Sequence, residues 1–186
     1  MITRPKKTIA FVVSSPRVYL WKVDLINKLS ETQDIHLFAN FEEAEIDKSL
    51  FNPSISIIHL PIIRKINLKG DIKALCLLIF YLYKLKLSSV HSITPKAGLL
   101  SMIAGFLCRI PNRIHTFTGQ VWSTKNFILR SILKGFDRII VLFSTQIIVD
   151  SLSQRNFLEV NRILKPGQGI VFGKGSISGI DTNRFK

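Results

Sequence analysis

Short apolar runs alternate with amphipathic stretches along most of this chain, and this alternation constrains the fold more than any other feature. Residues 8–14 form a continuous apolar run rich in β-branched side chains, which is typical of a strand buried on both faces of a parallel sheet. Apolar residues then recur at three- and four-residue intervals over 18–29, the stripe of an amphipathic helix. A second strand is expected at 34–40, so the chain opens with a β-α-β unit.

The same alternation continues to residue 156. Further strands are expected at 56–60, 89–93, 113–117 and 138–143, and further helices at about 69–87, 95–108, 127–136 and 145–156. Strands separated by helices form parallel sheets with right-handed crossovers, covered by helices on both sides. The sequence therefore predicts an α/β fold with a doubly wound, Rossmann-like parallel sheet.

The length of 186 residues suits one domain with a sizeable core. The longest apolar runs, 74–83 and 97–108, are shorter than the ~20 residues that a membrane-spanning helix needs. The apolar run near the N-terminus is also short and meets a Ser-Ser-Pro sequence instead of a cleavage site. We therefore expect a cytoplasmic protein.

A formal net charge of +14 is the outlier of the composition, and its field attracts phosphates. Nucleic acid, anionic lipid and a diphosphate-linked substrate all remain open as sources of these phosphates. The stretch 69–87 has lysines around an apolar centre, which suits the surface of an anionic bilayer. A helix that is apolar all round can equally be buried in the core, and both interpretations stay open.

Two classes of chemistry find no support in the residue pattern. Cys76 and Cys108 each lie in an apolar stretch without ligands at metal-binding spacing, so we expect buried free thiols. Acidic residues number only 12, and four of them crowd the segment 42–47. No spaced pair of carboxylates is therefore available at the predicted strand ends for acid and base catalysis.

Ligands of doubly wound sheets bind at the carboxyl ends of the strands, where the strand order reverses. This rule selects the residues that directly follow the first, fourth, fifth and sixth predicted strands. The candidate binding residues are Ser14, Ser15, Thr94, Lys96, Thr118, Gly119, Gln120 and Ser144.

Thr94 and the following proline predict a helix N-terminus, whose amide groups attract anions, and Lys96 would reinforce that site. The alternative is an ordinary helix start with its lysine facing water. Gly119 would let the backbone approach a ligand, and Thr118 and Gln120 offer neutral groups that suit sugar hydroxyls.

Three ring side chains lie in the same segments. Trp122 can offer a platform to a sugar ring, although we expect it to be buried. For His91 and His115 we favour hydrogen-bonded positions in the core over a functional role.

Three strings, 92–100, 113–122 and 173–185, resemble the N-terminal half of the bacterial family 4 retaining glycosyltransferases. These are two-lobed enzymes of the GT-B type that build surface polysaccharides on a lipid carrier. Many members carry a histidine where Thr118 stands, and this departure weakens the case for acid-base chemistry by a histidine in this segment. The resemblance assigns no catalytic residue to this chain.

The resemblance implies an acceptor-binding lobe at 1–172 and the start of an interdomain linker at 173–186, with Lys174, Gly175 and Ser176 at the mouth of the cleft. The second, donor-binding lobe would be absent. The implied acceptor is an undecaprenyl-diphosphate-linked saccharide at the cytoplasmic face of the membrane, and the implied donor is a nucleotide sugar. No other cofactor and no metal are expected, and the chain alone would transfer little sugar.

Two alternatives from other classes stay open at this point. One is a noncatalytic basic module on the membrane surface, and the other is a nucleic-acid-binding module. The second needs aromatic side chains interleaved with lysines, or a recognisable reading motif, and the sequence shows neither. No nucleic-acid partner is therefore expected.

Overall fold

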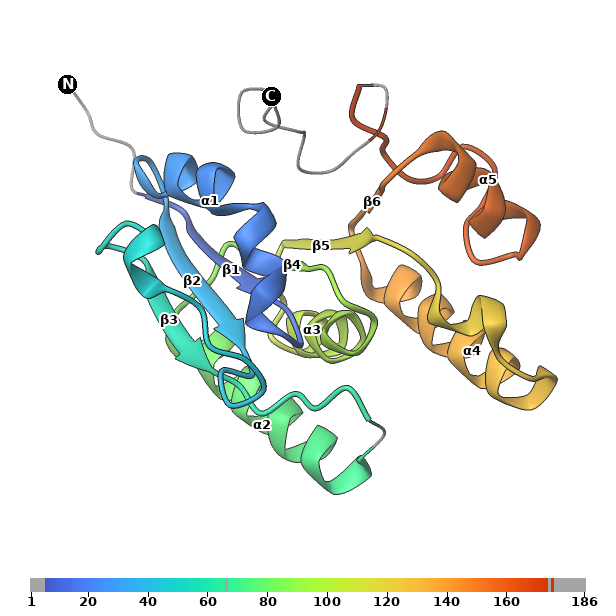
Figure 1. The fold of residues 1–186 in the computed structure, drawn as a ribbon, viewed down its shortest axis with the longest axis horizontal. Helices are drawn as coiled ribbons and strands as arrows, with labels where there is room; N and C mark the ends of the chain where they lie inside the picture. Colours follow the sequence, from blue (N-terminus) through green and yellow to red (C-terminus); the bar gives the residue numbers. More distant parts are fainter. Residues whose placement is uncertain (1–5, 66, 174, 176–186) are drawn as a thin grey trace.

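A six-stranded parallel sheet forms the centre of the molecule (Figure 1). The computed structural model describes residues 6–65, 67–173 and 175. The strands are β1 (Thr8–Val12), β2 (Asp34–Ala39), β3 (Ser56–His59), β4 (Ser89–Ser92), β5 (Asn112–Phe117) and β6 (Gln146–Val149). Their order is β3-β2-β1-β4-β5-β6, and every neighbouring pair is parallel. The prediction of a doubly wound α/β sheet is confirmed.

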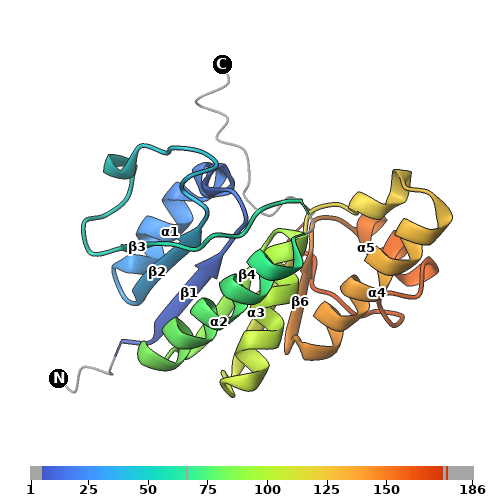
Figure 2. The same cartoon turned by 90° about the horizontal axis from the view of Figure 1, so that it is seen from below.

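Helices cover both faces of this sheet (Figure 2). They are α1 (Val23–Ser30), α2 (Leu68–Lys84), α3 (Pro95–Leu107), α4 (Phe127–Phe143) and α5 (Leu152–Val160), with short 3-10 helices η1 (Pro16–Trp21), η2 (Lys48–Leu50) and η3 (Val121–Thr124). On one face α1 and η1 pack beside β1 and β2, whereas α2, α3 and α4 form a layer on the other.

The two faces have separate cores, and β1 contributes to both. Ala10 and Val12 pack with the layer of α2, α3 and α4, while Phe11 and Val13 pack beneath α1 and η1. This alternation follows from the two-residue period of a strand. It explains why the strand has a continuous apolar sequence.

Small residues let α3 lie close to the sheet. A Cβ atom at Gly98 would come within 2.5 Å of the His115 ring on β5, and one at Gly105 would come within 3.0 Å of Val90 on β4. No side chain fits into the first of these contacts without displacing the histidine. The central helix is therefore fixed against β4 and β5.

The expected strand at 138–143 is wrong, because α4 continues through these residues to Phe143. The run is β-branched, but it extends the helical apolar period of the preceding turns, and it buries Ile140 in the core. The sixth strand is the next apolar run, Gln146–Val149, which had been expected to begin a helix. Tertiary packing here overrides the strand propensity of the isoleucines and valine.

Only one side of α2 is buried, through Ala74, Leu78 and Leu82. The possibility that this helix is buried all round is therefore wrong. Cys76 lies on its exposed side, so the expectation of a buried thiol is wrong there, whereas Cys108 is half-buried. Within the described part of the chain, no helix combines the length and hydropathy needed to cross a bilayer.

Candidate functional site

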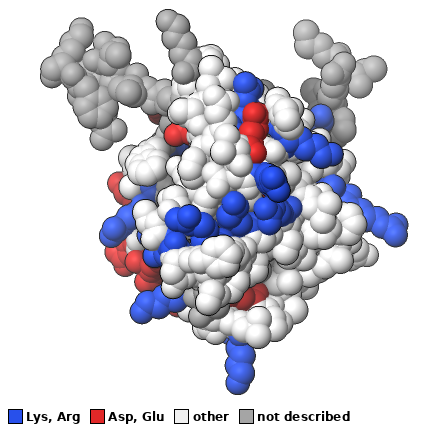
Figure 3. Space-filling view, turned by 90° about the vertical axis from the view of Figure 1, so that its right-hand side faces the viewer, with Lys and Arg blue, Asp and Glu red and all other residues white. Residues whose placement is uncertain are grey.

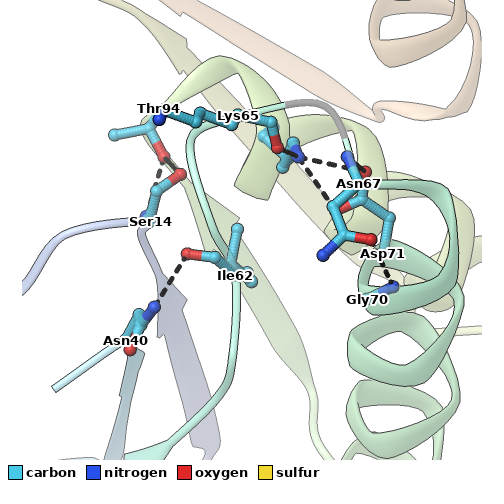
Figure 4. Close-up of polar contacts among 9 residues, drawn as sticks. Ser14, Asn40, Ile62, Lys65, Asn67, Gly70, Asp71 and Thr94 are labelled. Atoms are coloured by element: carbon cyan, nitrogen blue, oxygen red, sulfur yellow. Dashed lines mark hydrogen bonds and ion pairs between the residues drawn. The ribbon is translucent and has the colours of Figure 1, made fainter. Parts of the chain in front are cut away.

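The strand order reverses between β1 and β4, and Ser14 and Thr94 meet at this point (Figure 4). The Ser14 amide donates to Thr94 Oγ1 at 2.9 Å, and the two hydroxyl oxygens lie 2.8 Å apart. Because Thr94 Oγ1 is engaged in this way, it does not cap α3, although Thr94 stands at the N-cap position. Ser14 and the adjacent Ser15 are each only 2% exposed.

Lys96 does not face water, nor does it point at open space. Its ammonium contacts both carboxylate oxygens of Asp71, at 2.9 and 3.0 Å, and donates to the backbone carbonyl of Lys65 (Figure 4). The Lys96 and Asp71 side chains are 16% and 20% exposed. The ion pair joins the first turns of α3 and α2, so Asp71 compensates the charge that was expected to bind an anion.

We name Ser14, Thr94, Lys96 and Asp71 the switch-point cluster. Two asparagines beside this cluster are also hydrogen-bonded within the protein. Asn40 Nδ2 donates to the Ile62 carbonyl at 3.4 Å, and Asn67 caps α2 by accepting from the Gly70 amide (Figure 4). The polar groups of this half of the edge thus satisfy one another.

An open hollow of about 440 Å³ lies at the other half of the edge, beyond the ends of β5 and β6. We name it the β5–β6 pocket, and its lining residues are Thr118, Gly119, Gln120, Ser123, Asp150, Ser153, Gln154 and Phe157. It contains three of the predicted binding residues. Ser14, Thr94 and Lys96 do not line it, so the predicted site divides into two groups.

A short chain of hydrogen bonds crosses the pocket wall. The Asp150 amide donates to Gln154 Oε1 at 2.8 Å, and Gln154 Nε2 donates to Gln120 Oε1 at 3.3 Å. Gln120 Nε2 is buried and has no partner within the described residues. A buried donor without an acceptor is costly. Since this atom has almost no accessible surface, a ligand or a water reaches it only when the Gln120 side chain turns toward the hollow.

Gly119 has a φ of +142°, a conformation that L side chains rarely adopt. No heavy atom would lie within 4 Å of a Cβ placed on it, so space is open beside this backbone. Thr118, next to it, is exposed. This geometry agrees with the expectation that the backbone here is accessible to a ligand.

Trp122 lies beneath the pocket and is 3% exposed, as expected. Its indole stacks on Phe157 with centroids 5.3 Å apart, and Nε1 donates to Asp137 Oδ2 at 2.7 Å. Burial raises the pKa of the Asp137 carboxyl to about 6, while the bond from Trp122 acts to lower it. Trp122 therefore supports the pocket from below and offers no platform to a sugar.

Both histidines of the signature segments are hydrogen-bonded within the protein, as expected: His115 is buried and His91 is half-buried. His91 Nε2 lies 2.7 Å from Thr116 Oγ1, and His115 Nδ1 lies 2.8 Å from Ser92 Oγ. Burial lowers the pKa of each to about 3, with smaller contributions from the charge of Lys22 at His91 and of His91 at His115.

Ser144 was placed at the carboxyl edge, and this assignment is wrong. It follows α4 and precedes β6, so it lies at the opposite edge of the sheet, where its hydroxyl donates to the Ile140 carbonyl. The error follows directly from the misplaced sixth strand. Asp150 and Ser151 occupy the place that Ser144 was given.

Of the three residues predicted for the mouth of a cleft, Lys174 and Ser176 lie outside the described residues. Gly175 has a φ of +109°, and a Cβ on it would lie 3.1 Å from the Asp150 carbonyl. Gly175 therefore lies at the end of β6, beside the β5–β6 pocket.

The sequence interpretation missed Asp150, Ser153, Gln154 and Phe157, the second wall of the pocket. A signal for them was present: Ser151 stands three residues before Gln154, after an apolar run, and its hydroxyl accepts from the Gln154 amide as an N-cap. In the described part of the chain, no group of three or more His, Cys, Asp or Glu residues is placed to hold a metal ion.

No family model matches this sequence. The capsular polysaccharide biosynthesis glycosyltransferase CapM from Staphylococcus aureus is 33% identical over 127 residues, which are 68% of this chain and 33% of CapM. UDP-N-acetylglucosamine 2-epimerase from Rickettsia bellii has a similar fold, with a TM-score of 0.64 and 15% identity over 87% of this chain and 43% of that chain. The lipopolysaccharide outer core galactosyltransferase WaaB is similar with a TM-score of 0.61 and 12% identity, over 88% of this chain and 44% of WaaB.

The chain thus spans about a third of the length of CapM and less than half of each of the two solved chains. The structural neighbours share its fold at low sequence identity, and CapM is similar to it in sequence over 127 residues. Together these similarities confirm the resemblance noted in the sequence: this chain is a Rossmann-like domain of the GT-B N-terminal type, similar in sequence to a bacterial polysaccharide glycosyltransferase.

Proposed function

We propose that this chain is the acceptor-binding half of a retaining glycosyltransferase of surface polysaccharide biosynthesis. Its sugar comes from a nucleotide sugar, and its acceptor is a saccharide carried on undecaprenyl diphosphate. The similarity to CapM carries the proposal, because epimerases and glycosyltransferases share the fold and only the sequence relative favours transfer. The comparisons do not favour a noncatalytic basic module.

The β5–β6 pocket supports a saccharide acceptor. Its hydroxyl, amide and backbone groups lie at the carboxyl edge, where parallel sheets bind ligands. Such groups match the alternating donors and acceptors of a sugar. We assign Thr118, Gly119 and Gln120 to this acceptor, and we withdraw Ser144 from it.

Transfer requires a second lobe that binds the nucleotide and stabilises the departing diphosphate. Within the described residues, the switch-point lysine is already paired with Asp71 and is not available to the diphosphate. We expect little or no transfer from these 186 residues alone. A metal is not required in our proposal, so a chelator leaves the rate of the complete enzyme unchanged.

A transfer assay tests this proposal. Radiolabelled nucleotide sugars are supplied with lipid-linked saccharides, first to this chain alone and then to this chain together with a polypeptide that carries the donor lobe. We expect label in the lipid fraction only in the second case, with the anomeric configuration of the donor retained in the product. Full turnover by this chain alone overturns the half-enzyme assignment, and absence of transfer in both cases overturns the function.

We further propose that the chain sits on the inner face of the cytoplasmic membrane through its α2, α3 and α4 layer. On α2, Ile72, Phe80 and Tyr83 are 54%, 55% and 80% exposed, and Lys73 and Lys84 lie on the same outer part of the helix. Apolar side chains with basic neighbours bind anionic bilayers, at about 1 kcal/mol per lysine or arginine.

The α4 side has a similar character. Figure 3 shows a row of basic side chains across this face, next to uncharged surface. Arg138, Arg130 and Arg162 are close enough to Lys134 to lower its pKa, after the larger effect of burial. At the start of α4, Phe127 and Ile128 are 84% and 73% exposed.

Sedimentation with vesicles tests the membrane proposal. We expect binding to vesicles rich in phosphatidylglycerol and release by salt, and we expect the change Phe80→Ser with Tyr83→Ser to weaken binding. The exposed apolar residue Val160 on α5, changed to Ser, is the control. Equal binding to zwitterionic vesicles, or stronger binding to RNA than to anionic vesicles, contradicts it.

A further inference from the structure

The lining of the β5–β6 pocket differs in charge from the rest of the chain. The sequence has 26 Lys and Arg residues against 12 Asp and Glu. Among the residues that the structure describes, the pocket is lined by one carboxylic acid, Asp150, by no lysine or arginine, and otherwise by neutral residues. A site for a phosphate or a sugar carboxylate has the opposite composition, because such groups are bound by Arg, Lys or clustered amides.

Two groups of the pocket have hydrogen-bonding capacity that the described residues do not use. Gln120 Nε2 is a buried donor without an acceptor, since Gln120 Oε1 already accepts from Gln154. The side chain of Asp150 has no hydrogen bond or ion pair to any other residue that the structure describes, and only its backbone amide is bonded. The pocket therefore offers one free carboxylate acceptor, and it gains an amide donor when the Gln120 side chain turns its Nε2 out of the wall.

Among the described residues, Lys22 is a cation that senses the charge of Asp150. It is 5% exposed and follows η1; burial lowers its pKa, and the charge of Asp150 raises it again. The two side chains form no ion pair within 4.0 Å, and Lys22 does not line the pocket. Lys22 therefore does not occupy the Asp150 carboxylate, which stays free to accept from a ligand.

We propose that the β5–β6 pocket binds an uncharged sugar ring, with Gln120 donating to one hydroxyl and Asp150 accepting from another, and that Asp150 excludes rings that carry a carboxylate. This inference rests on the proposed function, because it takes the ligand to be the acceptor saccharide, and it narrows that acceptor to one with a neutral ring at the reacting end. Discrimination arises in two ways. A neutral ring satisfies both groups, whereas the carboxylate of a uronic acid is placed next to the like charge of Asp150.

Titration of the 186-residue chain with methyl glycosides, followed by ligand-observed NMR, tests the proposal. The probes are methyl glucoside, methyl galactoside and methyl N-acetylglucosaminide, compared with methyl glucuronide and methyl galacturonide. We expect at least one neutral glycoside to bind about tenfold more tightly than either uronide, a ratio that corresponds to about 1.4 kcal/mol. Asp150→Asn should weaken the neutral ligand severalfold and strengthen the uronides, so that the ratio approaches one.

A matched control separates the local effect from the change in net charge. Asp24 on α1 is exposed and outside the pocket, so Asp24→Asn makes the same change in charge and should leave the ratio unaltered. Gln120→Leu should weaken all glycosides and preserve the preference for neutral ones. Circular dichroism confirms that each variant is folded.

Three results overturn the proposal: uronides bind as tightly as the neutral glycosides, Asp150→Asn leaves the ratio unchanged, or no neutral glycoside binds the folded chain. These outcomes are independent of the transfer assay. If the enzyme transfers sugar but the pocket shows no selectivity, the proposed function stands and the β5–β6 pocket is not its acceptor site. Selective binding without any transfer shows a saccharide site whose function is not glycosyl transfer.

Discussion

The two halves of the carboxyl edge use their polar residues in opposite ways. In the switch-point cluster, each polar side chain has a partner, and the lysine lies in an ion pair with Asp71. In the β5–β6 pocket, Gln120 and Asp150 keep groups that no described residue engages. Both halves follow strands of the same sheet and both carry signature residues. The comparison teaches that residues at a ligand-binding edge bind ligand only where the fold has not already paired them.

The pH dependence of stability should separate the two halves most strongly. Burial raises the pKa of Asp137 beneath the pocket to about 6, so its contribution to stability is full below about 4 and is lost as pH rises through 6. Relative to Asp137→Asn, the wild type should lose on the order of 3 kcal/mol between pH 4 and 7. Urea unfolding of both proteins across this range measures the difference.

The histidines of β4 and β5 should act in the opposite direction. Because burial lowers their pKa values to about 3, stability should fall as pH decreases from 6.5 towards 3. His91→Gln should reduce this acid sensitivity, as measured by urea unfolding over the same pH range.

For Asp137, the contradicting outcome is a difference in unfolding free energy between wild type and Asp137→Asn that does not vary with pH. That result would contradict the assignment of a buried, ionisable Asp137.

Loss of the Lys96 ammonium should mainly destabilise the fold. Lys96→Met leaves Asp71 without its partner, and we expect a loss of about 2 kcal/mol, less than for a fully buried pair because both side chains retain some exposure. Urea unfolding measures it, and Lys73→Met on the exposed part of α2 is the control. If stability is unchanged and binding of inorganic phosphate is lost, Lys96 is a ligand-binding residue and the comparison fails.

A pair of threonine variants compares the two halves directly. Thr94→Val removes the acceptor of the Ser14 amide and the contact with its hydroxyl, and should cost about 1–2 kcal/mol. Thr118→Val removes a hydroxyl that is exposed in the pocket, and should change stability by less than about 0.5 kcal/mol. Thermal unfolding of the two variants tests this, and equal losses would show that Thr118 is also structural.

Gln120→Leu should have the smallest effect on stability. The variant loses one hydrogen bond with Gln154 but also removes a buried donor that has no acceptor, so the two effects nearly cancel, to within about 0.5 kcal/mol. Its effect should appear in glycoside binding instead. Chemical denaturation and NMR titration on one sample measure both quantities, and a large loss of stability would place Gln120 with the structural residues.

Local pattern was sufficient to predict five of the six strands. In β1, β2, β3, β4 and β5 the apolar runs are bounded by polar or turn residues, so strand ends lay within a few residues of the prediction. At the sixth strand two β-branched runs, 138–143 and 146–149, follow each other closely. The first run continues the helical apolar period of α4 and packs Ile140 beneath the sheet, and this packing favours the helix over a strand.

A residue of the site could be predicted when the strand that precedes it was predicted correctly. Thr118, Gly119 and Gln120 follow a correctly predicted strand, and they line the pocket. Asp150 and Gln154 follow the misplaced strand, and they were missed for that reason. The pairing of Lys96 could not be predicted either, because Asp71 lies on another helix, 25 residues away in sequence.

The contact between Gly98 and the His115 ring has a mechanical consequence. Since no methyl group fits between them, we expect α3 and β5 to move together as one rigid unit when the domain changes shape. The side of the β5–β6 pocket that follows β5 is therefore fixed relative to α3. Any widening of the hollow to admit a larger glycan must come from the α5 wall or from the turn around Gly119, which has empty space on one side.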